Sequence, residues 1–333
     1  ARVFVDWLQV SQHHGEAARE VVGEIRIVFG EDGEPKRESA GSITVRGSHD
    51  TALQVRSHAG WVVVSGNPSR FCRADNLFGL DLDDCMEVVN TELARLDLPG
   101  FTRGVPLDLK DEDVKLGRMQ AWTGAAFARL DVTTNYTTGS DFLARLAVRA
   151  YARMAKKRTR RHTFGDETAM WVTQRATVKA YRKGPDMAVH CKQSPWIEWA
   201  TQQGIVRHEL EARSKLLSDT GLRYWGNLTM SNLAELHHRH CAFLRRSDAS
   251  LDPCAVEHVP SRTRLAYSAW LKGENVRELV PRSSFYRYRR ELLDAANIDI
   301  AEQRDTAEVV PIVRTVELVP AVAPAGYWLR QAA

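Results

Sequence analysis

The sequence has few cysteines and no long apolar stretch. Its five cysteines are an odd number in a chain of 333 residues, and no two of them form a C-x-x-C pair. This usage argues against a disulfide framework and favours a reducing compartment. No apolar run approaches the roughly 20 residues of a membrane-spanning helix. The first residues, ARVFVDWLQV, also lack the basic and then apolar pattern of a secretory signal. We therefore expect a cytoplasmic protein without a membrane segment.

Lysine is scarce, and arginine carries most of the positive charge. The chain has 36 Arg and 10 Lys, yet its net charge is only +4. Residues 145–183 contain 12 Lys and Arg against 2 Asp and Glu, and residues 262–290 contain 8 against 2. A GC-rich genome accounts for a high ratio of arginine to lysine, but it does not account for this clustering. Two basic blocks on an otherwise acidic chain predict two contact regions for a polyanion.

The order of the expected elements indicates an α+β fold. Short alternating segments predict strands up to about residue 80, and apolar spacing predicts a helix over 83–96. A second series follows, with a strand at 125–136, a helix at 142–155 that ends in a charged run, a hairpin at 168–181 and a strand at 204–213. Ser140 or Asp141 is placed to cap the second helix. We predict two related antiparallel-sheet/helix units.

The end of the chain has a different pattern. Two short helices are expected around Gly273, and the second carries Arg287, Arg289 and Arg290 beside two tyrosines. This arrangement is typical of a helix-turn-helix region that binds DNA. The predicted divisions are a β-rich unit at 1–118, an α+β unit at 119–230, a helical region at 231–304 and an extended tail at 305–333.

Two acidic residues interrupt predicted strands. Asp131 lies within ARLDVTT and Glu209 within IVRHELEAR, and Glu211 alternates onto the same face as Glu209. Carboxylates in central strands need a partner because their burial is costly. A Mg²⁺ or Mn²⁺ ion between two such oxygen ligands is one interpretation. Salt bridges to the many arginines are the other, and the pattern alone does not separate them.

Other residues with reactive side chains are ambiguous by spacing alone. His237, His238 and His240 diverge around a predicted helix, so a metal site there is disfavoured. Tyr181 lies in ATVKAYRKG, where Lys179, Arg182 and Lys183 would support a phosphate next to a phenolate nucleophile. Simple packing of a strand tyrosine is the competing interpretation.

Four blocks of the chain, in this order, resemble the gene II type replication initiators of filamentous phages. They are GNPSRFCRADNLFG at 66–79, ARLDVT at 128–133, TVKAYRKG at 177–184 and GIVRHELEARSKLLSDTGL at 204–222. The segment LKGENVRELVPRSSFYRYRRELL also resembles the tail of many prophage members. The resemblance implies a nuclease core and a cytoplasmic endonuclease that nicks and rejoins one strand of origin DNA during rolling-circle replication.

The resemblance also implies roles for individual residues. Tyr181 matches the nucleophile that forms a 5′-phosphotyrosine, and Lys183 matches a family lysine. Asp131 and Glu209 match acidic positions, which we assign to a Mg²⁺ or Mn²⁺ ion. The chain lacks the His-hydrophobe-His strand of many rolling-circle initiators, and His190 and His208 are possible further ligands. Host helicase and polymerase are the implied protein partners.

The expected DNA contacts come from the basic blocks and from the loop at 67–73. That loop and the charged run at 156–161 are expected to guide a single strand, with Phe71 either stacking on a base or packing in the core. The second C-terminal helix is expected to bind duplex. The predicted DNA-binding residues are Asn67, Arg70, Arg73, Lys156, Lys157, Arg158, Arg160, Arg161, Lys179, Arg182, Arg282, Arg287, Arg289 and Arg290.

Two other functions fit the same sequence. A non-catalytic DNA-binding regulator would use the basic blocks and the helical pair without a covalent adduct. A relaxase-like mobilisation protein would share the tyrosine chemistry but is expected to carry a longer partner domain. Tyr136, a second protomer or water are open alternatives for the second cleavage.

Overall fold

A computed structural model shows how these elements are arranged. It describes residues 2–29, 34–108, 120–154, 159–165, 167–246, 259–296, 298–301 and 316–328. The strands are β1 Phe4–His13, β2 Ile25–Phe29, β3 Pro35–Ala40, β4 Ile43–Arg46, β5 Ala52–His58, β6 Trp61–Gly66, β7 Ala126–Thr137, β8 Arg160–Phe164, β9 Thr168–Val172, β10 Ala176–Arg182, β11 Ile205–Arg213 and β12 Val319–Pro320. The helices are α1 Leu82–Arg95, α3 Asp141–Arg153, α4 Lys183–His190, α5 Ile197–Gln202, α6 Ser214–Asp219, α7 Met230–Cys241, α8 Ser261–Leu271, α9 Val276–Leu279 and α10 Arg282–Ala296.

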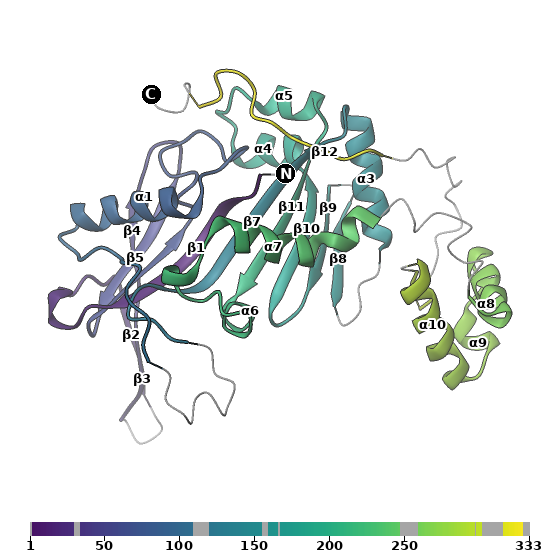
Figure 1. The fold of residues 1–333 in the computed structure, drawn as a ribbon, viewed down its shortest axis with the longest axis horizontal. Helices are drawn as coiled ribbons and strands as arrows, with labels where there is room; N and C mark the ends of the chain where they lie inside the picture. The colour runs from purple at the N-terminus through teal and green to yellow at the C-terminus, as the bar shows by residue number, and fades with distance from the viewer. Residues whose placement is uncertain are drawn as a thin grey trace.

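One large antiparallel sheet dominates the fold (Figure 1). Its strand order is β4-β5-β6-β1-β7-β11-β10-β9-β8, and the short β12 pairs with β7. In each half, the first strand lies at the centre and pairs with the last strand of that half, β1 with β6 and β7 with β11. The α+β class is therefore confirmed, and hydrogen bonds between β1 and β7 join the two halves into a single sheet.

The hydrophobic core lies between one face of this sheet and the helices. Alternating residues of β1, such as Leu8 and Val10, pack in the same cluster as Met86 and Val89 of α1. In the other half, Leu130 and Leu210 belong to the same core as residues of α3, α6 and α7. Because strand side chains alternate between faces, the polar residues of these strands point to the opposite face. That opposite face is where the site lies.

Local signals account for the helix that follows β7. Ser140 caps α3 by accepting a hydrogen bond from the Leu143 backbone, as one of the two expected cap residues. The prediction that this helix ends in the charged run is wrong, because α3 ends at Arg153 and Arg160–Phe164 forms the strand β8. The reason is long-range, since the backbone of β8 pairs with the edge of β9.

The C-terminal region has its own hydrophobic cluster. The helices α8, α9 and α10 pack against one another (Figure 1), and Ala266, Val276, Phe285 and Leu292 are among their buried residues. The segment at 316–328 is separate from these helices, because β12 pairs with β7 and the ring of Tyr327 is fully buried beside Phe78.

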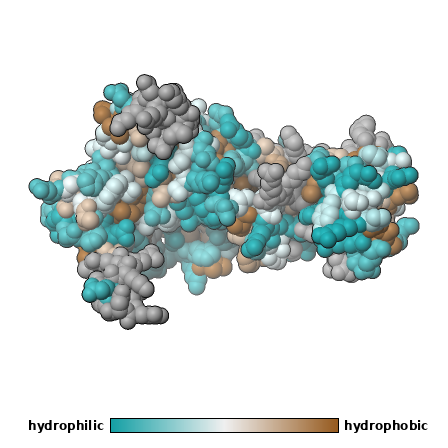
Figure 2. Space-filling model, turned by 90° about the horizontal axis from the view of Figure 1, so that it is seen from below, coloured by the Kyte–Doolittle hydropathy of each residue, from teal (hydrophilic) through white to brown (hydrophobic). Residues whose placement is uncertain are grey.

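The face of the molecule that is seen from below in Figure 2 is mainly hydrophilic where its residues are described. Figure 2 shows hydrophobic side chains in scattered patches among polar ones on the side seen from below. Among the residues that the structure describes, no helix combines the length and the hydrophobicity needed to cross a membrane.

Candidate active site

Three neighbouring strands bring the predicted site residues onto one face of the sheet. In the register of β10 and β11, Lys179 lies opposite Glu209 and Tyr181 lies opposite Arg207. In the register of β11 and β7, Glu211 lies opposite Asp131. Since residues two apart on a strand share a face, these side chains form one polar surface, opposite the helices that cover the core.

Tyr181 and Glu209 are in direct contact. The phenol of Tyr181 donates a hydrogen bond to Oε2 of Glu209 at 3.1 Å, and Lys179 Nζ lies 2.7 Å from Oε1 of the same carboxylate. Tyr181 is only 8% exposed. Burial and then the charge of Glu209 raise the pKa of Tyr181 well above its ordinary value. The phenol is therefore neutral at rest and has a carboxylate in place to accept its proton.

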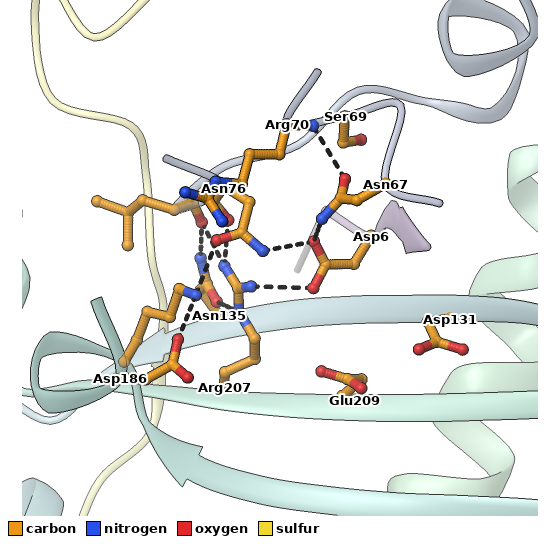
Figure 3. Close-up of polar contacts among 12 residues, drawn as sticks. Asp6, Asn67, Ser69, Arg70, Asn76, Asp131, Asn135, Asp186, Arg207 and Glu209 are labelled. Atoms are coloured by element: carbon orange, nitrogen blue, oxygen red, sulfur yellow. Dashed lines mark hydrogen bonds and ion pairs between the residues drawn. The ribbon is translucent and has the colours of Figure 1, made fainter. Parts of the chain in front are cut away.

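Asp131 is a second buried carboxylate beside Glu209. Arg129 holds it with two hydrogen bonds of 2.7 and 2.5 Å. Burial, together with repulsion from Glu209, raises the pKa of Asp131 to about 7 despite the arginine. Figure 3 shows the Asp131 and Glu209 side chains near each other on the sheet, away from the larger polar network around Asp6. The two acids are therefore close enough for the charge of Glu209 to act on Asp131.

The acid pair fits a divalent ion that keeps other ligands. In the described part of the chain, no three or more His, Cys, Asp or Glu residues are grouped as a complete metal site. Mg²⁺ commonly uses only one or two carboxylates and completes its shell with water and substrate phosphate. Asp131 and Glu209 each pair with one cation among the described residues, Arg129 at 2.5 Å and Lys179 at 2.7 Å, whereas Glu211 pairs with two arginines, Arg213 at 2.9 Å and Arg129 at 3.2 Å. These arginines outweigh its burial and lower its pKa. Asp131 and Glu209 remain the proposed ligands.

A second polar network stabilises the end of the same face. The fully buried Arg207 bonds to Asn135 Oδ1 at 2.9 Å, to Asp6 Oδ2 at 3.3 Å and to the Asn76 carbonyl at 2.6 Å. Burial alone would lower the pKa of Arg207, but Tyr181 and Asp6 raise it above its ordinary value. A permanently charged guanidinium therefore connects the loop at 67–80 to the strand of Glu209 (Figure 3).

Lys183 belongs to this network. It is the first residue of α4 and almost fully buried. Its Nζ lies 2.9 Å from Asn76 Oδ1, 2.7 Å from Asp186 Oδ2 and 5.9 Å from the centre of the Tyr181 ring. Lys183 outweighs the effect of burial on Asp186 and lowers the pKa of that carboxyl. Two internal partners thus fix the ammonium group next to the tyrosine.

The three predicted DNA contacts of the 67–73 loop all have internal partners. Asn67 donates to Asp6 Oδ1 at 2.9 Å, Arg70 donates to the carbonyl of His190 at 2.9 Å, and Arg73 donates to the carbonyl of Phe78 at 2.8 Å. Asn67 and Arg70 are half-buried, whereas Arg73 is buried. Phe71 is also buried and packs in the main hydrophobic core, which agrees with the core-packing interpretation and not with base stacking.

The other predicted DNA-binding residues differ in how exposed they are to solvent. Arg182 is buried against Asp141 and Glu167, and Arg289 forms two bonds of 2.6 Å with Asp299. Arg160 and Arg161 lie on the edge strand β8. Arg282, Arg287 and Arg290 are exposed on α10. Lys156, Lys157 and Arg158 lie outside the described residues.

Strand alternation separates the site from its alternatives. Tyr136 and His208 point to the opposite face, where their rings lie 4.8 Å apart and His208 Nε2 is 3.3 Å from the Tyr151 hydroxyl. His190 is exposed and contacts Asp186. Tyr136 and His208 therefore do not share the face that holds Tyr181, Asp131 and Glu209.

Sequence reasoning missed five residues that organise the site and its surroundings. Asp6, Arg129 and Arg207 lie in strand patterns that do not distinguish them from other polar strand residues. Asn76 lies within the block at 66–79 that resembles the family, so the sequence does point to its region. No motif or spacing points to Tyr327. The structural roles of these residues depend on contacts between positions that are distant in sequence, such as the Arg207–Asp6 pair.

Two family models and two relatives match most of the chain. Residues 4–231 match the family model for the N-terminal part of the replication-associated gene II protein of phages, and residues 258–331 match the model for its C-terminal part. The chain is 27% identical to the replication-associated protein of this type from Escherichia phage If1 over 310 residues, covering 79% of this chain and 93% of the relative. It is 26% identical to the corresponding protein of Enterobacteria phage I2-2 over 322 residues, covering 89% of each.

Proposed function

Since the chain belongs to the family of filamentous-phage replication-associated proteins, the gene II type initiators, we propose that it nicks and rejoins one strand of the phage origin. The substrate is origin DNA, bound first as duplex and cleaved as a single strand. The nick starts rolling-circle replication and the joining ends it. Host helicase and polymerase act on the nicked product. The single observation that carries this proposal is the hydrogen bond between Tyr181 and Glu209.

Tyr181 is the proposed nucleophile. As its oxygen attacks the scissile phosphorus, its proton passes to Glu209 Oε2, which is 3.1 Å away. The bond between phosphorus and the 3′ oxygen breaks, and the 3′ oxygen leaves and is protonated to a 3′-hydroxyl. The 5′-phosphate stays on the tyrosine. Because the phosphotyrosine conserves the energy of the broken bond, attack by a 3′-hydroxyl reverses the reaction and joins the strand without ATP.

Charge on the phosphate has to be neutralised during this attack. Asp131 and Glu209 would hold a Mg²⁺ or Mn²⁺ ion, which supplies Lewis-acid stabilisation of the phosphate when it is bound. Arg129 and Lys179 provide positive charge from the chain itself, next to the same two acids. Lys183 supports the phosphate from the buried side of the tyrosine. The ion pairs of these residues keep their charges in place before substrate arrives.

The C-terminal helices are proposed to bind the origin duplex. Arg282, Tyr286, Arg287 and Arg290 are exposed on α10, so they are accessible to a phosphate backbone. Arg289 and Tyr288 are less accessible, because Arg289 pairs with Asp299 and Tyr288 is buried in the local core. Recognition of the origin and cleavage are thus assigned to different parts of the chain.

Replacing the nucleophile tests this proposal. Tyr181→Phe is expected to abolish nicking of a supercoiled plasmid carrying the origin, and to leave duplex binding in a mobility-shift assay unchanged. Tyr136→Phe is the matched control, because Tyr136 is also buried but lies on the other face of the sheet. Denaturing gels should show a covalent DNA adduct with the wild type and with Tyr136→Phe only. Normal nicking by Tyr181→Phe would refute Tyr181 as the nucleophile and assign that role to another residue, such as Tyr136. Duplex binding by the wild type without nicking or any adduct would leave a DNA-binding regulator as the better description.

A further inference from the structure

The N-terminal half of the sheet presents a polar face that continues from the site. The strand registers align one row of side chains across six strands: Arg213, Arg129, Gln9, Ser65, Gln54 and Thr44. With neighbouring strands about 4.8 Å apart, this row is about 24 Å long. It passes two residues from Asp131, so it leads directly away from the proposed metal ligands.

The exposure pattern shows that this row is accessible. Gln9, Ser65 and Gln54 are half-exposed, whereas their strand neighbours Leu8, Val64 and Leu53 are buried in the core with α1. The helices therefore cover the opposite face of this half-sheet. A row of amide and hydroxyl groups offers donors and acceptors to nucleotides without contributing to the core.

The charge of this face also suits a nucleic acid. From Trp7 to His13 of β1, and along the described strands β4, β5 and β6, its side chains include no Asp or Glu. They do include two arginines, two histidines and two tryptophans: Arg46, Arg56, His13, His58, Trp7 and Trp61. Acids lie at the borders of the face, where each pairs with a basic residue: Glu20 with His58 at 3.0 Å, Asp131 and Glu211 with Arg129, and Asp6 with Arg207. This composition, with so little negative charge, is what a polyanion requires.

An aromatic residue lies where this face meets the site. Trp7 is opposite Asp131 in the register of β1 and β7, and it is half-exposed. The guanidinium of Arg129 lies 4.2 Å from the centre of its ring, and the same guanidinium binds Asp131. Trp7 also lies outside the hydrophobic clusters of the described residues. Indole and guanidinium planes are both surfaces on which bases stack.

We propose that this face binds single-stranded DNA next to the scissile phosphate, along the Gln9–Ser65–Gln54 row and with a base stacked at Trp7 and Arg129. This rests on the proposed function, because the site supplies the reason for a single strand to be present. It gives the N-terminal half a role in substrate binding. The row and Tyr181 lie on the same face of one continuous sheet.

The test places a negative charge on the face and measures binding without cleavage. Gln9→Glu and Gln54→Glu keep the side-chain shape, and Ala94→Glu adds the same charge on the exposed side of α1. All three are made in the Tyr181→Phe background without divalent ions, so that cleavage and metal binding play no part. The probe is a fluorescent oligo(dT) of about 16 nucleotides, within the range of single-strand sites. Anisotropy should show binding at least fivefold weaker for both Gln variants and unchanged for Ala94→Glu.

Three outcomes would overturn the proposal. Equal affinities for Gln9→Glu and Ala94→Glu would show that the face carries no DNA, whether or not Tyr181 is the nucleophile. Equal losses for oligo(dT) and for a duplex of the same length would show that it binds duplex instead. A change of oligomeric state in sedimentation, with unchanged DNA affinity, would show that a second copy of the chain occupies the face.

Discussion

Replacing Glu209 by Gln tests its role as proton acceptor. The amide keeps the size of the side chain and can still accept the hydrogen bond of Tyr181, but it cannot take the proton. Positioned general bases contribute about 10² to 10⁴ in rate, which corresponds to about 3 to 5 kcal/mol of activation free energy. The 3.1 Å contact is already within the range for direct transfer. We therefore expect single-turnover nicking to slow by about 10² to 10⁴ near pH 7, with duplex affinity unchanged.

The matched control is Glu211→Gln. Glu211 lies two residues further along the same face, bonds to Arg213 at 2.9 Å and lies 3.6 Å from Lys179 Nζ, so its partners are cations and not the phenol. Its replacement should slow nicking by less than about tenfold, because Glu211 is assigned neither the proton of Tyr181 nor the metal ion. Supercoiled and nicked origin plasmid, separated on agarose gels over time, give both rates.

Two further conditions separate proton transfer from metal binding at Glu209. If Glu209 accepts the proton, raising the pH should rescue Glu209→Gln, because hydroxide then removes the phenol proton. The loss of a neighbouring negative charge also lowers the pKa of Tyr181, which works in the same direction. If Glu209 only binds metal, excess Mg²⁺ should restore the rate instead. Glu209→Gln rates within threefold of those for Glu211→Gln at neutral pH would refute the assignment.

Two other predictions concern the tail and the acid pair. Tyr327→Phe removes a buried hydroxyl that lies 2.6 Å from Asp75 and 2.9 Å from the Phe78 amide; it should lower the free energy of unfolding by about 2 kcal/mol in denaturant titrations, and the exposed Tyr286→Phe should not. The pKa of Asp131 is raised to about 7, so the carboxylate is protonated below that pH and ionised above it. Calorimetric Mn²⁺ affinity should fall about tenfold per pH unit below 7 and level off above it, and Asp131→Asn should remove this dependence; a flat wild-type profile would contradict the assignment.

The parts of the fold that follow from local pattern were predictable from sequence. The alternation in AAFARLDVTTNY places Asp131 on the face opposite the core, and the apolar spacing of α1 places its buried side. Ser140 caps its helix through a contact three residues away. Each of these features depends on neighbours in the chain, and the sequence displays those neighbours directly.

The parts that depend on distant segments were not predictable. Arg160 begins a strand because the backbone of β8 pairs with the edge of β9. The burial of Arg207 depends on its ion pair with Asp6, which is 201 residues earlier. Arg73 and Arg182 have the side-chain type that contacts DNA phosphates, yet in the fold each is buried and bonded to internal partners. Basic residues alone therefore predict that a polyanion is bound, but they do not predict which of them bind it.

The chain leaves the sheet for the helical region and then returns to it. Leu244 is still part of the main core, and Tyr327 is buried again against Phe78 of the loop that holds Arg207. The helices α8 to α10 are thus an insertion between two anchored segments. A fluorophore at position 328 would consequently report on the surroundings of the proposed nicking site, although in sequence it follows the helices that are proposed to bind duplex. A label on α10 would be needed to follow those helices themselves.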